Sequence, residues 1–141
     1  MYQVPQITDS VYYVGVNDRM KERFENVWSI PSGVAYNAYL IVDEKTTLID
    51  TVDVCYSDVF FHKLDLILQG RPVDYLIINH MEPDHCASME EIILRYPDVK
   101  IVSTEKALML MHQFNYDVDA NFIQVAEGDT MSFGKHNVVF V

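Results

Sequence analysis

The chain has few cysteines and few basic residues. Cys55 and Cys86 are its two cysteines in 141 residues, too few for the disulfide framework of a small secreted domain, so we expect reduced thiols. Lysine and arginine together number 10 against 21 aspartates and glutamates, which gives a formal net charge of −11. A surface of this sign repels phosphate backbones and anionic lipid, and therefore argues against nucleic acid or a membrane surface as partner.

Long hydrophobic runs and a glycine-rich loop are also missing. No run of apolar residues reaches the roughly 18 that a membrane span needs, and Met1–Pro5 shows no basic or apolar leader pattern. We therefore expect a protein of the cytoplasm. The five glycines do not form a Gly/Ser/Thr-rich loop between a strand and a helix, so the chain offers no phosphate-cradling place for FMN.

What the sequence does contain is a regular alternation of short β-rich runs and helical patterns. Half of the residues are hydrophobic, enough for one domain with a real core, and the alternation predicts an α/β fold. Strands are expected at residues 11–14, 36–42, 46–49, 75–78, 100–102, 122–125, 131–133 and 138–141. Helices are expected at 57–69, at 88–96 after a capping box formed by Ser88 and Glu91, and after Ser103 or Thr104 with Ala107, Leu110, Met111 and Phe114 inward.

Four potential metal ligands lie within six residues directly after the apolar run 75–78. They are His80, Glu82, Asp84 and His85. Pro83 argues against a helix through the segment, so we predict a loop at the end of a strand. Side chains two residues apart share a face of an extended backbone, which lets His80, Glu82 and Asp84 converge, while His85 turns the other way. This arrangement suits two adjacent metal ions better than one.

The ligand types narrow the choice of metal. Two imidazoles and two carboxylates without thiolate suit iron, manganese or zinc, and are poor for a structural zinc site built on cysteine. The carboxylate of Glu82 favours iron. The alternative, that these are polar loop residues making caps and turns, would be preferred for a single His beside a single Asp. Four ligands at this spacing favour a metal site.

The string His80-x-Glu82-x-Asp84-His85 resembles the His-x-His-x-Asp-His signature of the metallo-β-lactamase fold. Glutamate in place of the second histidine resembles the flavodiiron proteins. The resemblance extends over nearly the whole chain, through Phe24-Glu25-Asn26-Val27-Trp28, Ile30-Pro31-x-Gly33, Tyr36-Asn37-Ala38-Tyr39-Leu40-Ile41, Asp43-Glu44-Lys45, Leu48-Ile49-Asp50-Thr51-Val52 and Asn79 to His85.

The resemblance implies a metallo-β-lactamase-like αββα sandwich, of which residues 1–141 supply roughly the first half, and a centre of two irons. His80 and Glu82 would bind one iron, and Asp84 and His85 the other. Asp50 would hydrogen-bond to and orient the ligand loop, with Asn79 and Cys86 also beside the site. The chain resembles the N-terminal part of the family, without the flavodoxin-like module that carries FMN.

In the family, another histidine, a bridging aspartate and a further histidine complete the ligand set, and we expect them beyond Val141. Within the chain, His62, His112 and His136 are the remaining histidines, and ordinary core or surface roles are favoured for all three. Four ligands do not saturate two irons, so residues 1–141 alone are expected to bind iron weakly.

The leading functional hypothesis is the diiron domain of a reductase of O2 to water or of NO to N2O. Its electrons would come from a flavodoxin-like module or a rubredoxin, and the resemblance implies a homodimer. A second hypothesis is a flavin-free diiron protein that binds O2 as a sensor or carrier. A zinc hydrolase, with metal-bound hydroxide as nucleophile, is disfavoured because such enzymes carry histidine at the position of Glu82.

Overall fold

The computed structural model describes residues 4–24, 26 and 28–141. Met1–Gln3, Glu25 and Val27 lie outside the described residues, so the predictions made for Met1–Pro5 and for the Phe24–Trp28 motif are not fully tested. The strands are β1 (Gln6–Thr8), β2 (Val11–Tyr13), β3 (Val16–Asp18), β4 (Arg23–Phe24), β5 (Trp28–Ser29), β6 (Val34–Tyr36), β7 (Tyr39–Val42), β8 (Thr46–Ile49), β9 (Tyr75–Ile77), β10 (Lys100–Ser103), β11 (Phe122–Gln124), β12 (Thr130–Ser132) and β13 (Asn137–Val139). The helices are α1 (Ser57–Leu68), α2 (Pro83–Cys86), α3 (Met89–Arg95) and α4 (Glu105–Gln113), with 3₁₀ turns at Val54–Tyr56 and Asp119–Asn121.

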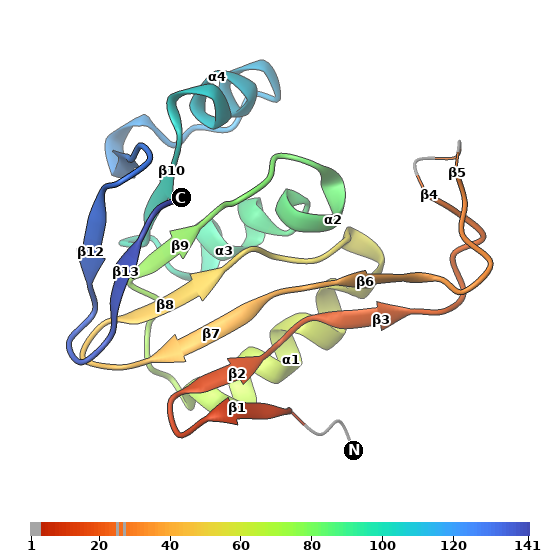
Figure 1. The fold of residues 1–141 in the computed structure, drawn as a ribbon, viewed down its shortest axis with the longest axis horizontal. Coiled ribbons are helices and arrows are strands. Elements are labelled where there is room, and N and C mark those ends of the chain that lie inside the picture. The colour runs from red at the N-terminus through yellow and green to blue at the C-terminus, as the bar shows by residue number, and fades with distance from the viewer. Residues whose placement is uncertain (1–3, 25, 27) are drawn as a thin grey trace.

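A seven-stranded mixed sheet forms the centre of the molecule (Figure 1). Its strand order is β1-β2-β7-β8-β9-β10-β11. The hairpins before β8 pair antiparallel, whereas β8, β9, β10 and β11 run parallel because a helix-containing crossover joins each to the next. Parallel strands end at the same edge of a sheet, so the segments after β8, β9 and β10 meet there.

Side-chain alternation along the strands divides the core into two clusters. Leu48 and Leu76 belong to the larger cluster, in which Leu64 of α1 and Ile92 of α3 are fully buried. The next residue along β9, Ile77, belongs to the smaller cluster on the opposite face. The near-continuous apolar runs of these strands are therefore explained by burial on both faces.

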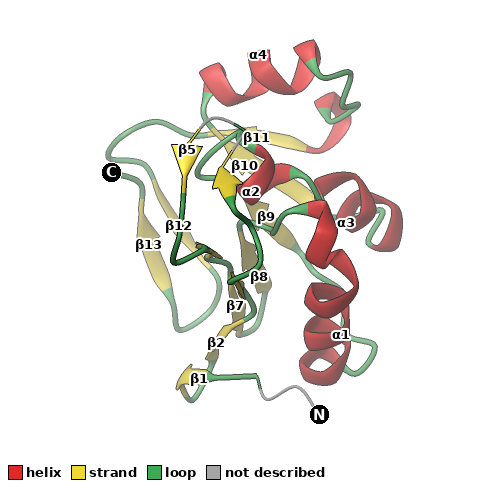
Figure 2. Ribbon diagram, turned by 90° about the vertical axis from the view of Figure 1, so that its right-hand side faces the viewer, coloured by secondary structure: helices red, strands yellow, loops and turns green. Residues whose placement is uncertain are grey.

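The two faces of the sheet are covered differently. Helices α1 and α3 lie on one face, and the hairpin β12–β13 lies on the other (Figure 2). Phe133, between β12 and β13, is fully buried and its ring lies 5.6 Å from that of Tyr75 on β9. The layers seen are thus helix, sheet and the beginning of a second β layer, which confirms the predicted α/β class.

Two secondary-structure predictions were wrong in detail. Residues 36–42 are not one strand: β6 pairs with β3, and β7 pairs with β2. The break falls at Ala38, whose carbonyl accepts from both Val14 and Gly15. Phe114 was expected to face the core, but it ends α4 as the C-cap and is 58% exposed. Local periodicity does not reveal where a strand changes partner or where a helix stops.

Ser88 precedes α3, but it does not make the predicted capping-box bond. Its side chain makes no hydrogen bond to the helix N–H groups. The buried hydroxyl donates instead to the carbonyl of Val52, at 3.1 Å. A tertiary acceptor has therefore replaced the local one that the sequence pattern predicts.

No helix in the described part of the chain is long and apolar enough to cross a bilayer.

Three hairpin turns meet at His136. Its Nδ1 lies 2.6 Å from Asp43 Oδ2, its Nε2 lies 3.0 Å from Ser10 Oγ, and its backbone N–H donates to Asp43 Oδ2 at 2.8 Å. These contacts tie the turn between β12 and β13 to the turns β1–β2 and β7–β8. Hydrogen bonding from His136, with further backbone N–H bonds, holds the pKa of Asp43 well below its usual range.

This contact predicts a pH dependence of stability. A carboxylate whose folded-state pKa is depressed contributes stability above its unfolded pKa of about 3.9, and that contribution is lost as pH falls through the folded value. We expect the free energy of unfolding to decrease on acidification below about pH 4, and Asp43→Asn to flatten this part of the profile. Urea denaturation at a series of acidic pH values measures how the free energy of unfolding depends on pH in the unmodified chain and in Asp43→Asn. Identical pH profiles for the two would contradict the prediction.

Candidate metal centre

The four candidate ligands lie on residues 79–85, which we call the ligand segment. It follows β9 and ends in the short helix α2. Backbone bonds close that turn: the N–H groups of His85 and Cys86 both donate to the carbonyl of Glu82, each at 2.9 Å. The prediction that Pro83 keeps the whole segment in a loop was therefore wrong for its second half. Proline has no N–H to donate, and the first position of a helix needs none, so Pro83 starts α2 rather than preventing it.

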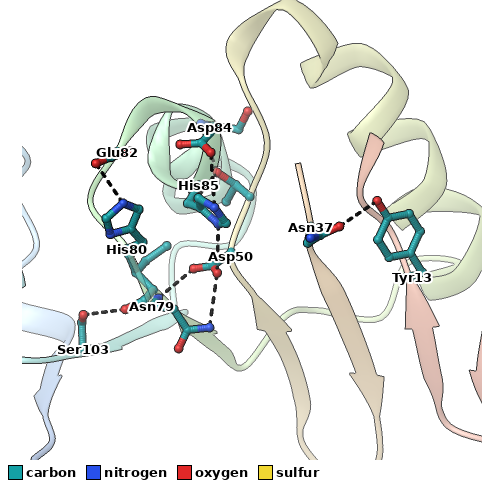
Figure 3. A network of polar contacts seen from close by, with 12 residues as sticks. Tyr13, Asn37, Asp50, Asn79, His80, Glu82, Asp84, His85 and Ser103 are labelled. Atoms are coloured by element: carbon teal, nitrogen blue, oxygen red, sulfur yellow. Dashed lines mark hydrogen bonds and ion pairs between the residues drawn. The ribbon is translucent and has the colours of Figure 1, made fainter. Parts of the chain in front are cut away.

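The four predicted ligands lie near one another as two pairs (Figure 3). His80 Nε2 is 3.0 Å from Glu82 Oε1, and His85 Nε2 is 3.4 Å from Asp84 Oδ2. The two imidazole rings are 5.6 Å apart, centroid to centroid. The first pair is exposed, whereas the side chains of Asp84 and His85 are only 10% and 22% exposed. The described residues contain no group of three or more His, Cys, Asp or Glu already arranged to hold a metal ion.

One atom in this cluster fits a cation. Asp84 Oδ1 is buried and has no hydrogen-bond partner among the described residues. A buried carboxylate oxygen without a donor is costly, because it has lost water and gained nothing in return. A metal ion supplies the missing partner, and the adjacent imidazole and carboxylate donors are those that iron accepts. The residues present therefore fit a metal centre.

Asp50, directly after β8, contacts both ends of the ligand segment, at Asn79 and at His85. Its Oδ1 accepts from the backbone N–H of Asn79 at 2.7 Å, and its Oδ2 lies 3.2 Å from Asn79 Nδ2 and 3.1 Å from His85 Nδ1. Asp50 has a positive φ of 58°, a conformation that Asp and Asn tolerate better than most residues. The hydrogen bond to Asp50 raises the pKa of His85, against an opposing effect of burial.

Cys86 follows His85 but packs into the core. It is 5% exposed, and both cysteines are free. Burial, with the neighbouring carboxylates, raises the pKa of the Cys86 thiol to about 11. The thiol is therefore protonated near neutral pH and is a small apolar neighbour of the ligand segment rather than a ready thiolate donor.

The remaining histidines lie on other elements. His112 on α4 pairs with Asp119, with Nε2 and Oδ1 2.7 Å apart. His136 is held between Asp43 and Ser10. His62 lies on an exposed position of α1. These positions agree with the ordinary roles expected for them.

A cavity of about 260 Å³ opens beside the first ligand pair. Asn79, His80 and Glu82 line it on one side, and Thr104 and Ala107 at the start of α4 line it on the other. The more exposed pair of candidate ligands, His80 and Glu82, thus borders a space large enough for small molecules, whereas Asp84 and His85 do not line it.

Sequence reasoning assigned none of three buried polar side chains that contact this region to the site: it gave Ser88, and Ser103 as an alternative to Thr104, only as helix caps. Thr51 Oγ1 donates to the carbonyl of His85 at 2.8 Å, Ser103 Oγ donates to the carbonyl of Ile78 at 2.7 Å, and Ser88 bonds to Val52. No spacing in the sequence indicates these particular bonds, since each is made to a backbone atom of a segment far away in the sequence. For Thr51 and Ser103, the one indication of such a role in the sequence was their position at the end of a predicted strand.

A sheet with helices on one face, a second β layer beginning on the other, and a His/Asp/Glu cluster at the strand ends define a metallo-β-lactamase-like domain. The family model described as ODP family beta lactamase matches residues 34–141. The chain therefore belongs to the ODP family, the metallo-β-lactamase-like family of the flavodiiron proteins.

Similar proteins include a nitric oxide reductase of Moorella thermoacetica, 35% identical over 142 residues, which span all of this chain and 36% of that protein. An anaerobic nitric oxide reductase flavorubredoxin of Vibrio vulnificus is 31% identical over 96% of this chain and 28% of its own length.

Among solved structures, the rubredoxin oxygen:oxidoreductase of Desulfovibrio gigas matches with a TM-score of 0.90 and 33% identity over 97% of this chain and 34% of that one. The flavodiiron protein of Giardia intestinalis matches with a TM-score of 0.88 and 25% identity over 97% of this chain and 33% of that one. The chain thus spans about a third of the length of these relatives.

Proposed function

We propose that residues 1–141 are the iron-binding part of a flavodiiron-type reductase of NO or O2, and form roughly the first half of its metallo-β-lactamase-like domain. The observation that carries the proposal is Asp84 Oδ1, a buried carboxylate oxygen that has no hydrogen-bond partner among the described residues, beside the His85 imidazole and near the His80–Glu82 pair. Membership of the flavodiiron family and the names of the relatives support the reaction.

Within this proposal each pair of side chains holds one iron. His80 and Glu82 hold the iron that faces the cavity, and Asp84 and His85 hold the deeper one. Asp50 keeps the His85 ring oriented through Nδ1, so that Nε2 remains available as the donor atom. Asn79 fixes the strand end from which His80 projects, through its own backbone bond to Asp50.

Electron counting defines what else the reaction needs. Two ferrous ions held by these residues would supply one electron each, which is enough for 2 NO + 2 e⁻ + 2 H⁺ → N2O + H2O, whereas reduction of O2 to two waters takes four electrons. A flavodoxin-like module carrying FMN, or a rubredoxin, is the proposed donor, because the sequence of this chain predicts no phosphate-cradling loop for FMN. A homodimer and a cytoplasmic location complete the proposal, the first by resemblance and the second because two cysteines without a disulfide framework suit a reducing compartment.

The proposal is tested by titrating the chain with Fe(II) alone and, in a separate experiment, with Zn(II) alone, both without oxygen, because Zn(II) displaces Fe(II) from most N/O sites when both are present. We expect weak Fe(II) binding at the site, and NO consumption with N2O formation when reduced FMN is supplied as electron source. Glu82→Ala should lose one metal more than the other and abolish turnover. The control is His112→Ala, which removes an exposed histidine that also pairs with a carboxylate, and it should change neither quantity.

Other outcomes decide between the alternatives. Zinc without iron would overturn the diiron proposal in favour of a metallo-hydrolase. Uptake of one equivalent of O2 without further turnover would replace the reductase with an oxygen carrier or sensor.

A further inference from the structure

The ligand segment is anchored at both ends by buried hydroxyl groups from two different strands. Thr51 follows β8 and is 0% exposed, and Ser103 ends β10 and is 4% exposed. Both donate to main-chain carbonyls, Thr51 to that of His85 and Ser103 to that of Ile78. These carbonyls flank the stretch 79–84, so the hydroxyls bracket the segment that carries the ligands. Figure 3 shows Ser103 reaching this segment from the side opposite to Asp84 and His85.

The anchor at Thr51 has more than one bond. The backbone N–H of Thr51 also donates to the carbonyl of His85, again at 2.8 Å, so a single carbonyl accepts from both groups of one residue. The same hydroxyl accepts from the backbone N–H of Ser88 at 3.4 Å. Because one hydroxyl joins the carbonyl of His85 to the start of α3, it fixes the orientation of α2, which carries Asp84 and His85.

Other buried hydroxyls of the same sheet make no such contacts. Thr46 and Thr47 on β8 are 0% exposed, and neither Oγ1 has a hydrogen-bond partner among the described residues. A threonine on this strand is therefore not hydrogen-bonded merely because it is buried. The bonds of Thr51 and Ser103 are specific to the ligand segment, and Thr47 provides an internal control for removal of a buried threonine hydroxyl.

We propose that Thr51 and Ser103 are positioning residues of the metal centre, which hold the carbonyls at the two ends of the ligand segment and so fix the separation of the His80–Glu82 pair from the Asp84–His85 pair. The inference rests on the proposed function, because it concerns the same metal site. A clamp of this kind holds the carbonyl groups of Ile78 and His85, and is distinct from the contacts of Asp50, whose carboxylate holds the His85 ring and the backbone N–H of Asn79.

The experiment compares Thr51→Val, Thr51→Ser, Ser103→Ala and Thr47→Val in anaerobic titrations with Fe(II) alone. Residues that support metal ligands typically change affinity about 10–100-fold, so we expect at least a tenfold loss for Thr51→Val and for Ser103→Ala. Thr51→Ser keeps the hydroxyl and should stay within about threefold of the unmodified chain. Thr47→Val should leave affinity unchanged, because it removes a hydroxyl that has no partner.

A second measurement needs no metal. The amide groups of Cys86 and Ala87 close α2 by donating to Glu82 and Pro83, and their hydrogen exchange reports how firmly the turn is held. Thr51→Val should speed this exchange about tenfold or more relative to Thr47→Val, and Thr51→Ser should not.

The outcomes separate the two proposals. If the unmodified chain binds no Fe(II), the proposed function fails, and the exchange rates still decide whether the clamp exists. If iron binds and both measurements are the same in Thr51→Val and Thr47→Val, the positioning role is overturned. If Thr51→Val does not fold, the test is made with Thr51→Ser and Ser103→Ala. Equal iron affinity in Ser103→Ala and the unmodified chain then overturns the two-ended clamp.

Discussion

Asp84→Asn is expected to abolish detectable iron binding while leaving the metal-free chain folded. The asparagine keeps the size of the side chain but removes the negative charge that a ferrous ion requires of a hard oxygen donor. The loss of Fe(II) affinity should exceed the roughly 10–100-fold typical of residues that only support a ligand. Equilibrium dialysis against a graded series of Fe(II) concentrations measures it.

The stability of the same variant tests the reason for the loss. Asp84 Oδ1 makes no hydrogen bond in the described structure, and Oδ2 makes only the 3.4 Å contact with His85. Removing a buried charge that has so few partners should change the free energy of unfolding of the metal-free chain by no more than about 1 kcal/mol. A large loss of Fe(II) affinity with little change in the free energy of unfolding would show that Asp84 binds the metal and contributes little to stability.

The matched control is Asp119→Asn, at an exposed aspartate that also pairs with a histidine. Its iron affinity should equal that of the unmodified chain. If Asp119→Asn weakened Fe(II) binding as much as Asp84→Asn, the loss would come from the lower net negative charge of the chain and not from a lost ligand. If Asp84→Asn bound iron normally, Asp84 would not be a ligand.

Asp50→Asn is expected to weaken both the fold and the site. Asp50 is 4% exposed and its carboxylate holds Asn79 and the ring of His85. Hydrogen bonds to charged groups contribute about 1.5–3 kcal/mol, so we expect a loss of roughly 2–3 kcal/mol in the free energy of unfolding. Fe(II) affinity should fall about 10–100-fold. Urea denaturation and iron titration on the same preparation give both numbers.

Asp50→Ala separates the side-chain bonds from the backbone conformation. Asparagine tolerates the positive φ at this position, whereas alanine pays about 1–2 kcal/mol for it. Asp50→Ala should therefore be less stable than Asp50→Asn by about that amount. Equal stability of the two variants would show that the left-handed conformation at residue 50 costs the chain nothing.

His85 provides the pH-dependent readout for the same contact. Its folded-state pKa is raised, chiefly by Asp50, so its contribution to stability is present below the unfolded pKa of about 6.5 and is lost as pH rises through the folded value. In Asp50→Asn the pKa of His85, followed by NMR titration of the metal-free chain, should move down, and this part of the pH dependence should diminish. An unchanged pKa would assign the shift to another group.

The sequence was a good guide wherever chemistry is carried by residues close together in the chain. His80, Glu82, Asp84 and His85 were found from spacing alone, and the structure places them in two contacting pairs. The partition of the surrounding strands and helices followed from their apolar periodicity. The prediction for Pro83 was wrong because proline breaks a helix from within but is favoured at its first position. Only the backbone bonds to the carbonyl of Glu82 show that the second case applies.

By itself the sequence determined the α/β class, the candidate donor set and the resemblance that connects the chain to the flavodiiron family, because periodicity, ligand chemistry and motif spacing are local properties. Only the tertiary structure decided which groups meet across distance: Asp50 with His85, Thr51 with the carbonyl of His85, Ser103 with the carbonyl of Ile78, and His136 with Asp43. The physical reason is the parallel sheet, which brings three separate strand ends to one edge. A hydrogen bond made there to a backbone atom leaves no pattern in the residues that it joins.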